Sequence, residues 1–281
     1  MIDLHMHSTC SDGTFGPSEL VRQVKAAGVT HMALTDHDTV AGLAEAREEA
    51  ARQGVAFLGG LEISAELQPG TMHILGYGFD EGSAHLLERL EYVRRARRER
   101  NPKIIANLNG LGFEIRLEEV AAKAGGEVLG RPHFAQVMLD KGYVESTQEA
   151  FDKYLAKGKP AYMDKERLSP GESVNVIRSA GGVAVLAHPL QLKARSDEEL
   201  EALIGGLVDA GLQGMECYYR NHTPEVTRNF LLLAKRFGLI PTGGSDFHGA
   251  SRPHIHLGTG EGNLKVPMEC WDSLVSRIVG K

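Results

Sequence analysis

Imidazole and carboxylate side chains recur through this sequence in the arrangement expected of a metalloprotein. His5 and His7 stand one residue apart near the N-terminus, and Asp12 follows five residues after His7. Related polar groups return later, in the segments LTDHDT and GGSDFH. The candidate metal ligands number nine: His5, His7, Asp12, His37, Glu62, His73, His188, Asp246 and His248.

The types of these side chains indicate the metal and the chemistry. Six imidazoles and three carboxylates without a thiolate favour manganese, with iron or zinc as alternatives. Nine donors are too many for one ion, so we expect two or three divalent ions with a carboxylate bridging a pair. Three such ions would leave the site with a formal charge of about +3 and would attract phosphate. Two bridged ions can activate a hydroxide for in-line attack on phosphorus.

A pair of histidines with this spacing is not sufficient evidence of a metal site. A second pair, His254 and His256, occurs near the C-terminus without any further donor left to complete a site. We expect that pair to be structural. The first pair differs because it follows a predicted strand whose successors also end in donors.

The elements that must position these donors alternate between strand and helix. Strand-like segments occur at residues 1–5, 30–36, 55–64, 71–79, 181–188, 212–219 and 239–246, with amphipathic helical segments between most of them. This order predicts parallel strands in a barrel or in an open, doubly wound sheet. A barrel brings the carboxyl ends of all its strands to one face, where the donors would converge. No glycine-rich phosphate-binding motif follows a strand, which disfavours the open nucleotide-binding sheet.

The alternation is interrupted by a helical, highly charged segment. We predict that residues 1–82 and 169–281 form the metal-binding barrel and that residues 83–168 form an inserted helical subdomain. Pro102 is expected to break or kink the long first helix of this insertion, because proline lacks an amide donor and clashes with the preceding turn.

The composition excludes several other classes of protein. The chain has 281 residues, and 42% of them are hydrophobic, as in packed soluble proteins. The absence of a long apolar run and of a leader predicts a cytoplasmic protein without a membrane partner. A net charge of −6 argues against binding of long duplex nucleic acid. Three scattered cysteines indicate neither a disulfide framework nor a thiolate zinc site.

The successive motifs resemble those of the PHP (polymerase and histidinol phosphatase) family. The matching elements are HMH with the following aspartate, TDHD, a glutamate that ends a strand, a later histidine, AHP and SDFH, in the family's order. The resemblance implies a distorted (β/α)7 barrel, a trinuclear metal site and phosphoester hydrolysis.

The resemblance also implies how the ligands are shared among the ions. One ion would take His5, His7, Glu62 and Asp246. A second would share Glu62 and take His73 and His188. The third would take Asp12, His37 and His248.

Within this family, the segments IDLHMHSTCSDGT, TDHDTVAGL and GRPHFA are most similar to the group that acts on nucleotides. The resemblance implies removal of the 3′-phosphate from nucleoside 3′,5′-bisphosphates, or 5′-to-3′ exonuclease activity on short RNA. Histidinol phosphate is a further candidate substrate. Metal-dependent amide hydrolysis or deamination is a competing class, although no lysine ends a predicted strand to bridge the ions. A non-catalytic module that binds a nucleotide is a third class.

The insertion and one later segment supply candidate substrate-binding residues. The predicted helix carries Arg94, Arg97 and Arg98, whose guanidinium groups suit a phosphate that does not react. The remaining candidates are Arg131 and His133 in GRPHFA, and Asn221 and His222 in YYRNHT. His222 is a candidate general acid for the leaving ribose oxygen, and His133 and Asp246 are the other candidate catalytic residues.

Overall fold

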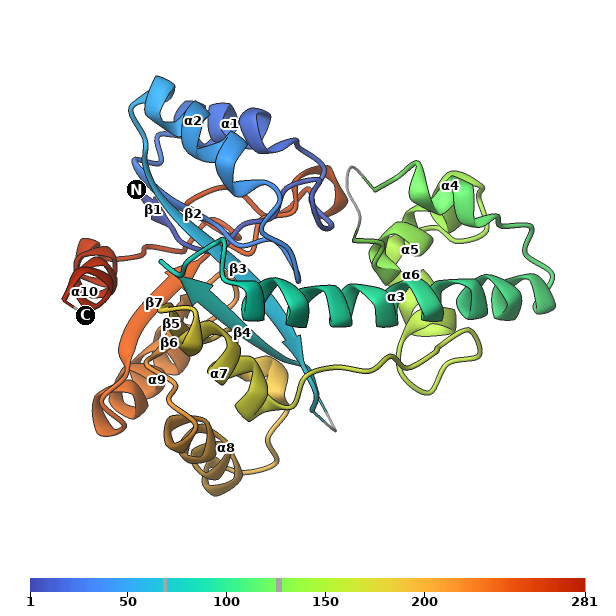
Figure 1. Cartoon of the computed structure of the whole chain (residues 1–281). Coiled ribbons are helices and arrows are strands. Elements are labelled where there is room, and N and C mark those ends of the chain that lie inside the picture. The colour runs from blue at the N-terminus through green and yellow to red at the C-terminus, as the bar shows by residue number, and fades with distance from the viewer. Residues whose placement is uncertain (68–69, 125–127, 281) are drawn as a thin grey trace.

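Seven strands form one sheet that closes almost completely into a barrel (Figure 1). The computed structural model describes residues 1–67, 70–124 and 128–280, so residues 125–127 of the predicted insertion lie outside the described residues. The strands follow one another around the sheet in chain order: β1 Ile2–Asp3, β2 His31–Leu34, β3 Ala56–Ala65, β4 Met72–Tyr77, β5 Val183–Leu186, β6 Gly214–Tyr219 and β7 Ile240–Gly244. The ends of the sheet meet where the Leu4 amide donates to the Gly243 carbonyl at 3.2 Å. The predicted seven-stranded α/β barrel is confirmed.

The expectation of parallel strands is wrong for β4. This strand pairs antiparallel with both β3 and β5, whereas the other neighbouring pairs are parallel. The cause is the connection between β3 and β4, which is too short to hold the helix that a parallel crossover needs. Reversal brings the first residues of β4 beside the last residues of β3, and His73 pairs with Ser64. His73 therefore reaches the same end of the barrel as donors at the carboxyl ends of the other strands.

Helices cover the outside of the barrel and one of its ends. The outer helices are α1 Pro17–Ala26, α2 Leu43–Gln53, α7 Pro170–Ser179, α8 Asp197–Asp209 and α9 Pro224–Arg236, with short 3₁₀ turns η2 Pro189–Leu192 and η3 Gly249–Ser251. Inside the barrel, Leu4, Leu75 and Val185 pack together with Leu274 of α10 (Met268–Val279). The last helix closes the end of the barrel away from the inserted helices (Figure 1).

The insertion is helical and has an apolar core of its own. It contains α3 Ala84–Gly110, α4 Leu117–Ala121, α5 Arg131–Asp140, α6 Thr147–Ala150 and the π-helical turn η1 Phe151–Leu155. Ile104, Leu108 and Phe134 lie in this second core. Figure 1 shows α3 extending from the barrel to the short helices at the right. The boundaries of a separate folding unit at 83 and 168 stay a prediction.

The predicted break at Pro102 does not occur, because α3 continues through this residue to Gly110. Apolar side chains are buried on both sides of the proline. Leu90 and Val93 pack on the barrel, and Ile104 and Leu108 pack in the core of the insertion. Burial at both ends offsets the loss of one helical hydrogen bond.

In the described part of the chain, none of the helices combines the length and the apolar character that a membrane span requires.

Candidate metal centre

All nine predicted metal ligands come together at one end of the barrel. Their ligand atoms form four overlapping groups, and within each group the atoms lie within 4.8 Å of one another. The groups are His7, Asp12, His37 and His248; His5, Glu62 and His188; His5, His7 and Asp246; and His37, Glu62 and His73. Segments far apart in the sequence meet here because parallel strands end on the same face.

Glu62, in the carboxyl-terminal half of β3, lies in the middle of the cluster. Its Oε1 is 2.8 Å from His73 Nδ1 and 3.0 Å from His188 Nε2. Its Oε2 is 3.0 Å from His37 Nδ1 and 3.3 Å from His7 Nε2. Each oxygen therefore faces a different set of imidazoles, which is the arrangement of a carboxylate that bridges two ions.

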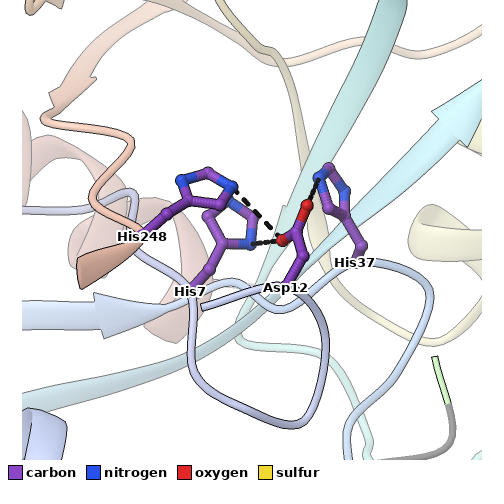
Figure 2. A group of neighbouring side chains, drawn as sticks. All are labelled: His7, Asp12, His37 and His248. Atoms are coloured by element: carbon purple, nitrogen blue, oxygen red, sulfur yellow. Dashed lines mark ion pairs between the residues drawn. The ribbon is translucent and has the colours of Figure 1, made fainter. Parts of the chain in front are cut away.

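Asp12 connects the N-terminal loop to the segment that follows β7. Figure 2 shows its carboxylate among three imidazoles. Asp12 Oδ1 lies 3.2 Å from His248 Nε2 and 3.8 Å from His7 Nδ1. Asp12 Oδ2 lies 3.9 Å from His37 Nε2. Because His37 also faces Glu62, it belongs to two of the four groups. The histidine thus lies between the proposed second and third metal positions.

The loop that carries Asp12 is fixed by a buried carboxylate. Asp36 accepts hydrogen bonds from the Ser8 amide at 2.8 Å, the Ser8 hydroxyl at 2.5 Å and the Ser11 hydroxyl at 2.6 Å. These contacts hold the turn from which Asp12 extends. Asp36 therefore positions a metal ligand through the backbone rather than through His37.

Several buried donor atoms in this cluster have no hydrogen-bond partner among the described residues. They include His5 Nε2, His7 Nε2, His248 Nε2 and Glu62 Oε2. Leaving such groups buried and unpaired is unfavourable by about 1–3 kcal/mol each, and a bound cation would satisfy them together. The donor set therefore fits the divalent ions that the sequence predicts.

The pKa values of His7 and Glu62 agree with this interpretation, whereas His37 would have to release a proton in order to bind an ion. Burial and the neighbouring His248 lower the pKa of His7 to about 3, which leaves its ring neutral with a lone pair to donate. Burial alone would raise the pKa of Glu62, but His37 and His73 hold that pKa well below its ordinary value. The pKa of His37 is raised to about 9 because Glu62 and Asp12 outweigh the effect of burial.

Backbone strain is concentrated at the same place. Asp38, His188 and Asp246 have φ values of +53°, +26° and +53°, in a region that favours glycine. Such conformations are unfavourable by about 1–3 kcal/mol and persist where the surroundings impose them. The described chain has one other non-glycine residue with positive φ, Lys193. The strain thus occurs at two of the predicted ligands, His188 and Asp246, and at Asp38, the residue that follows the ligand His37.

The predicted arginines of α3 do not share one environment. The Arg97 guanidinium pairs with the Asp38 carboxylate and donates to the Ser64 hydroxyl at 3.1 Å. Arg94 donates to the Asp38 carbonyl at 3.1 Å. Arg98 is half exposed and pairs with Glu91 on the surface of the helix. Arg97 and Arg94 therefore face the turn after His37, and Arg98 faces solvent.

Arg97 is part of a buried cationic cluster beside the metal centre, which we define as Arg97, Arg100, Arg131, Lys165 and Arg167. Burial and nearby Arg97 lower the pKa of Arg100 to about 9 and the pKa of Lys165 well below its ordinary value. The Lys165 side chain is 3% exposed, and its Nζ lies 3.9 Å from Asp38 Oδ2 without a hydrogen-bond partner among the described residues. Arg100 lies in the same arginine-rich run of the sequence as Arg97, whereas no motif marks Lys165 or Arg167. Their proximity to one another arises only in the folded chain.

The two other predicted histidines have different hydrogen-bonding states. His133 Nδ1 accepts from the Gly130 amide at 3.0 Å, so its Nε2 carries the proton. His222 Nδ1 donates to the Cys217 carbonyl at 2.9 Å, and its buried Nε2 has no hydrogen-bond partner among the described residues. Asn221, next to His222, is exposed. His133 can therefore donate a hydrogen bond, whereas His222 has a lone pair that can take up and release a proton.

His254 and His256, the second closely spaced pair, are both exposed and lie outside all four donor groups.

The nearly closed barrel, with candidate metal-binding groups of imidazoles and carboxylates gathered at one end, defines the class of this protein. More narrowly, the chain belongs to the PHP domain family, whose profile matches residues 3–249 and so includes all nine donors.

Three known proteins are similar over most of their length. The 3′,5′-nucleoside bisphosphate phosphatase of Chromobacterium violaceum is 36% identical, with 99% of this chain and 98% of the relative covered. The 5′-3′ exoribonuclease Rnm of Escherichia coli is 34% identical, with 91% of this chain and 87% of the relative covered. A solved structure from Bifidobacterium adolescentis, assigned as a metal-dependent phosphoesterase, has a TM-score of 0.88 and 31% identity and covers 100% of this chain and 98% of its own.

Proposed function

We propose that this protein is a metal-dependent phosphohydrolase that removes the 3′-phosphate from nucleoside 3′,5′-bisphosphates and releases the nucleoside 5′-monophosphate and phosphate. The observation that carries the proposal is the buried cationic cluster beside a set of nine metal donors. One site suits the reacting phosphate and the other suits a second phosphate of the same molecule. The name of the Chromobacterium violaceum relative supports the same substrate.

Three manganese ions would occupy the nine donors. His5, His7, Glu62 and Asp246 would hold one ion; Glu62, His73 and His188 would hold the second; and Asp12, His37 and His248 would hold the third. When bound, these ions would supply a hydroxide nucleophile at neutral pH and neutralise charge on the reacting phosphate. Glu62 would be shared by the first two ions, in agreement with the contacts of its Oε2 to His7 and of its Oε1 to His73.

The cationic cluster would hold the 5′-phosphate. Its five basic side chains face two nearby carboxylates, Asp38 beside Arg97 and Asp164 beside Arg167. The surplus of positive charge suits a dianionic phosphate group. Of the arginines named from the sequence, we retain Arg97 and Arg131 in this role and place Arg94 at its edge. The exposed, Glu91-paired Arg98 is the weakest of the predicted ligands.

The histidines would act on the reacting group and its leaving oxygen. The Nε2–H of His133 would donate a hydrogen bond to substrate, because the Gly130 amide occupies its Nδ1. His222 would transfer the proton, because the carbonyl of Cys217 fixes its Nδ1–H and leaves Nε2 to exchange protons. Asp246 would serve as a metal ligand, and Asn221 would contact substrate from the surface.

The test is phosphate release by the manganese-loaded protein from adenosine 3′,5′-bisphosphate, with adenosine 3′-monophosphate and adenosine 5′-monophosphate as comparisons. We expect rapid release from the bisphosphate and at most slow release from the 5′-monophosphate. If no phosphoester is cleaved, including histidinol phosphate, the proposal is wrong. An ultraviolet shift without phosphate would indicate deamination. If the wild type binds the nucleotide without hydrolysing it, and Asp246→Asn therefore has no activity to lose, the protein is a sensor.

A second candidate activity is 5′-to-3′ hydrolysis of short RNA, which the name of the Escherichia coli relative favours. The cationic cluster could hold a terminal 5′-phosphate of an oligonucleotide as well as that of a bisphosphate. Comparing short RNAs with a 5′-phosphate or a 5′-hydroxyl tests this activity, since only the former would be cleaved efficiently. A location in the cytoplasm and the absence of duplex and membrane partners stay predictions from the sequence.

A further inference from the structure

Strand β6 contributes none of the nine predicted metal ligands, yet two of its buried side chains contact predicted ligands that follow three other strands. Glu216 Oε1 accepts from His5 Nδ1 at 3.1 Å, and its Oε2 accepts from the His188 amide at 2.7 Å. The Tyr219 hydroxyl donates to Asp246 Oδ2 at 2.7 Å. Glu216 is 1% exposed and Tyr219 is 3% exposed.

An irregularity in β6 puts both side chains on the same side. Glu216 pairs with Thr242 of β7, but the next pair is Tyr218 with Gly243, so Cys217 is an extra residue in the strand. In a regular strand, residues three apart point to opposite faces. The bulge reverses this alternation, and Glu216 and Tyr219 both reach the metal centre.

Glu216 determines which nitrogen of His5 faces the ions. Because Nδ1 donates to Glu216, the neutral ring keeps its lone pair on Nε2. That nitrogen lies 3.4 Å from Glu62 Oε1 and 3.5 Å from Asp246 Oδ1 and has no hydrogen-bond partner among the described residues. The other Glu216 oxygen holds the amide of His188, whose backbone is strained at φ +26°.

Tyr219 has a corresponding effect on Asp246. Asp246 Oδ2 accepts hydrogen bonds from Tyr219 and, at 2.8 Å, from Arg252. Asp246 Oδ1 lies 3.3 Å from His7 Nε2 and 3.5 Å from His248 Nδ1. The two donors on Oδ2 thus leave Oδ1 as the oxygen that points into the donor cluster.

We propose that Glu216 and Tyr219 are positioning residues for the metal centre. Glu216 fixes the tautomer of His5 and the backbone of His188, and Tyr219 fixes the orientation of Asp246. The inference rests on the proposed metal site and adds to it two residues that bind neither ion nor substrate. Carboxylates that orient metal-binding imidazoles typically contribute about 10–100-fold to metal affinity.

Glu216→Gln tests this role with almost no change in shape. Glutamine has one accepting and one donating end, and the His188 amide requires the accepting end. The donating end would then face His5 Nδ1 and favour the tautomer that carries its proton on Nε2, where it blocks the lone pair. We expect the affinity of the metal-free protein for Mn²⁺, measured by calorimetry, to fall about 10–100-fold. Glu49→Gln is the matched control, because Glu49 is a 6%-exposed carboxylate that contacts Arg22 and Arg52 outside the metal centre.

Nitrogen NMR of the zinc-loaded protein with ¹⁵N-labelled histidine provides a signature that loss of stability would not produce. In the wild type, His5 should show a protonated Nδ1 and a metal-bound Nε2, and Glu216→Gln should lose this pattern. Tyr219→Phe should weaken Mn²⁺ binding while His5 keeps its pattern. If Glu216→Gln does not fold, Tyr219→Phe decides: reduced affinity supports the inference, and wild-type affinity overturns it.

The failure of this inference differs from the failure of the proposed function. A wild-type protein that binds no Mn²⁺ would remove the metal site and the inference with it. A wild type that binds Mn²⁺, together with a Glu216→Gln variant of equal affinity and unchanged His5 signals, would overturn the positioning role alone.

Discussion

Replacing Lys165 by methionine tests whether this lysine binds substrate or stabilises the fold. Methionine keeps the unbranched apolar stem and removes the charge. In the folded protein, Nζ lies 3.9 Å from Asp38 Oδ2, a separation that gives an attraction of about 4 kcal/mol at an effective dielectric constant of about 20. Burial and Arg97 act in the opposite direction and prevail, since the pKa of Lys165 is lowered.

The charge on Lys165 is therefore unfavourable until an anion binds. We expect the free energy of unfolding of Lys165→Met to equal or exceed that of the wild type, because a buried charged group without a hydrogen-bond partner is removed. In the proposed complex, the Lys165 ammonium donates a charge-assisted hydrogen bond to the 5′-phosphate, and such a bond contributes about 1.5–3 kcal/mol. Its loss in Lys165→Met should lower kcat/KM for adenosine 3′,5′-bisphosphate by about 10–150-fold.

The assay compares two substrates and two variants. Adenosine 3′-monophosphate lacks the 5′-phosphate, so its kcat/KM should change less than about twofold in Lys165→Met. Lys159→Met is the control, because Lys159 is an exposed lysine nearby in the chain. Equal losses on both substrates would show that Lys165 supports the metal centre instead. An unchanged rate on the bisphosphate, or a marked loss of stability, would refute the reasoning.

Three further changes test neighbouring parts of the site. Asp12→Ala should lower the manganese content by one ion per chain in elemental analysis, because it removes the carboxylate between three imidazoles; an unchanged content would contradict the third metal position. Arg98→Ala should leave kcat/KM within about twofold of the wild type, since Arg98 pairs with Glu91 at the surface; a loss above tenfold would give it a substrate contact. Asp38→Asn should lower the free energy of unfolding most above about pH 4, which is the pKa of an aspartate in the unfolded chain. Although burial raises the pKa of Asp38, Arg97 and then Lys165 lower it well below that value, so the stabilisation by the charged form is lost as pH falls. Urea unfolding at pH 7 and pH 3 measures the difference, and a gap that does not shrink at pH 3 would contradict it.

The convergence of the predicted metal ligands at one end of the barrel could be inferred from the sequence, because the strands determine where these residues lie. His5 and His188 follow apolar runs and Glu62 lies in the last half of one, and a barrel brings the carboxyl-terminal parts of such runs together whatever the details of packing. The structure places His73 beside Glu62 and His37, as the prediction requires, although the reversed direction of β4 was not expected. The length of the β3–β4 connection contained this information, since it leaves no room for a crossover helix.

The supporting residues could not be found in the same way. Glu216 stands within the apolar segment MECYY, where a buried carboxylate needs partners, but its partners are 211 residues away at His5 and 28 residues away at His188. Lys165 lies in a segment without any regular pattern. Arg97 and Arg98 are adjacent, and the direction in which α3 meets the barrel decides which of them reaches Asp38. These are tertiary relations, and the local pattern does not contain them.

The turn after β2 joins the two parts of the proposed active site. His37 contacts Glu62 and Asp12 in the metal centre, and the next residue, Asp38, pairs with Arg97 of the insertion. The Asp38 carboxylate also accepts from the Ser64 amide at 3.0 Å, two residues after Glu62. Through Asp38, Arg97 of the cationic cluster is thus held against the backbone segments that carry His37 and Glu62, which sets the distance between this part of the cluster and the metal ligands. On the proposed function, this fixed spacing is what selects a substrate with two phosphates: a molecule whose phosphates are closer together or farther apart could reach one site only.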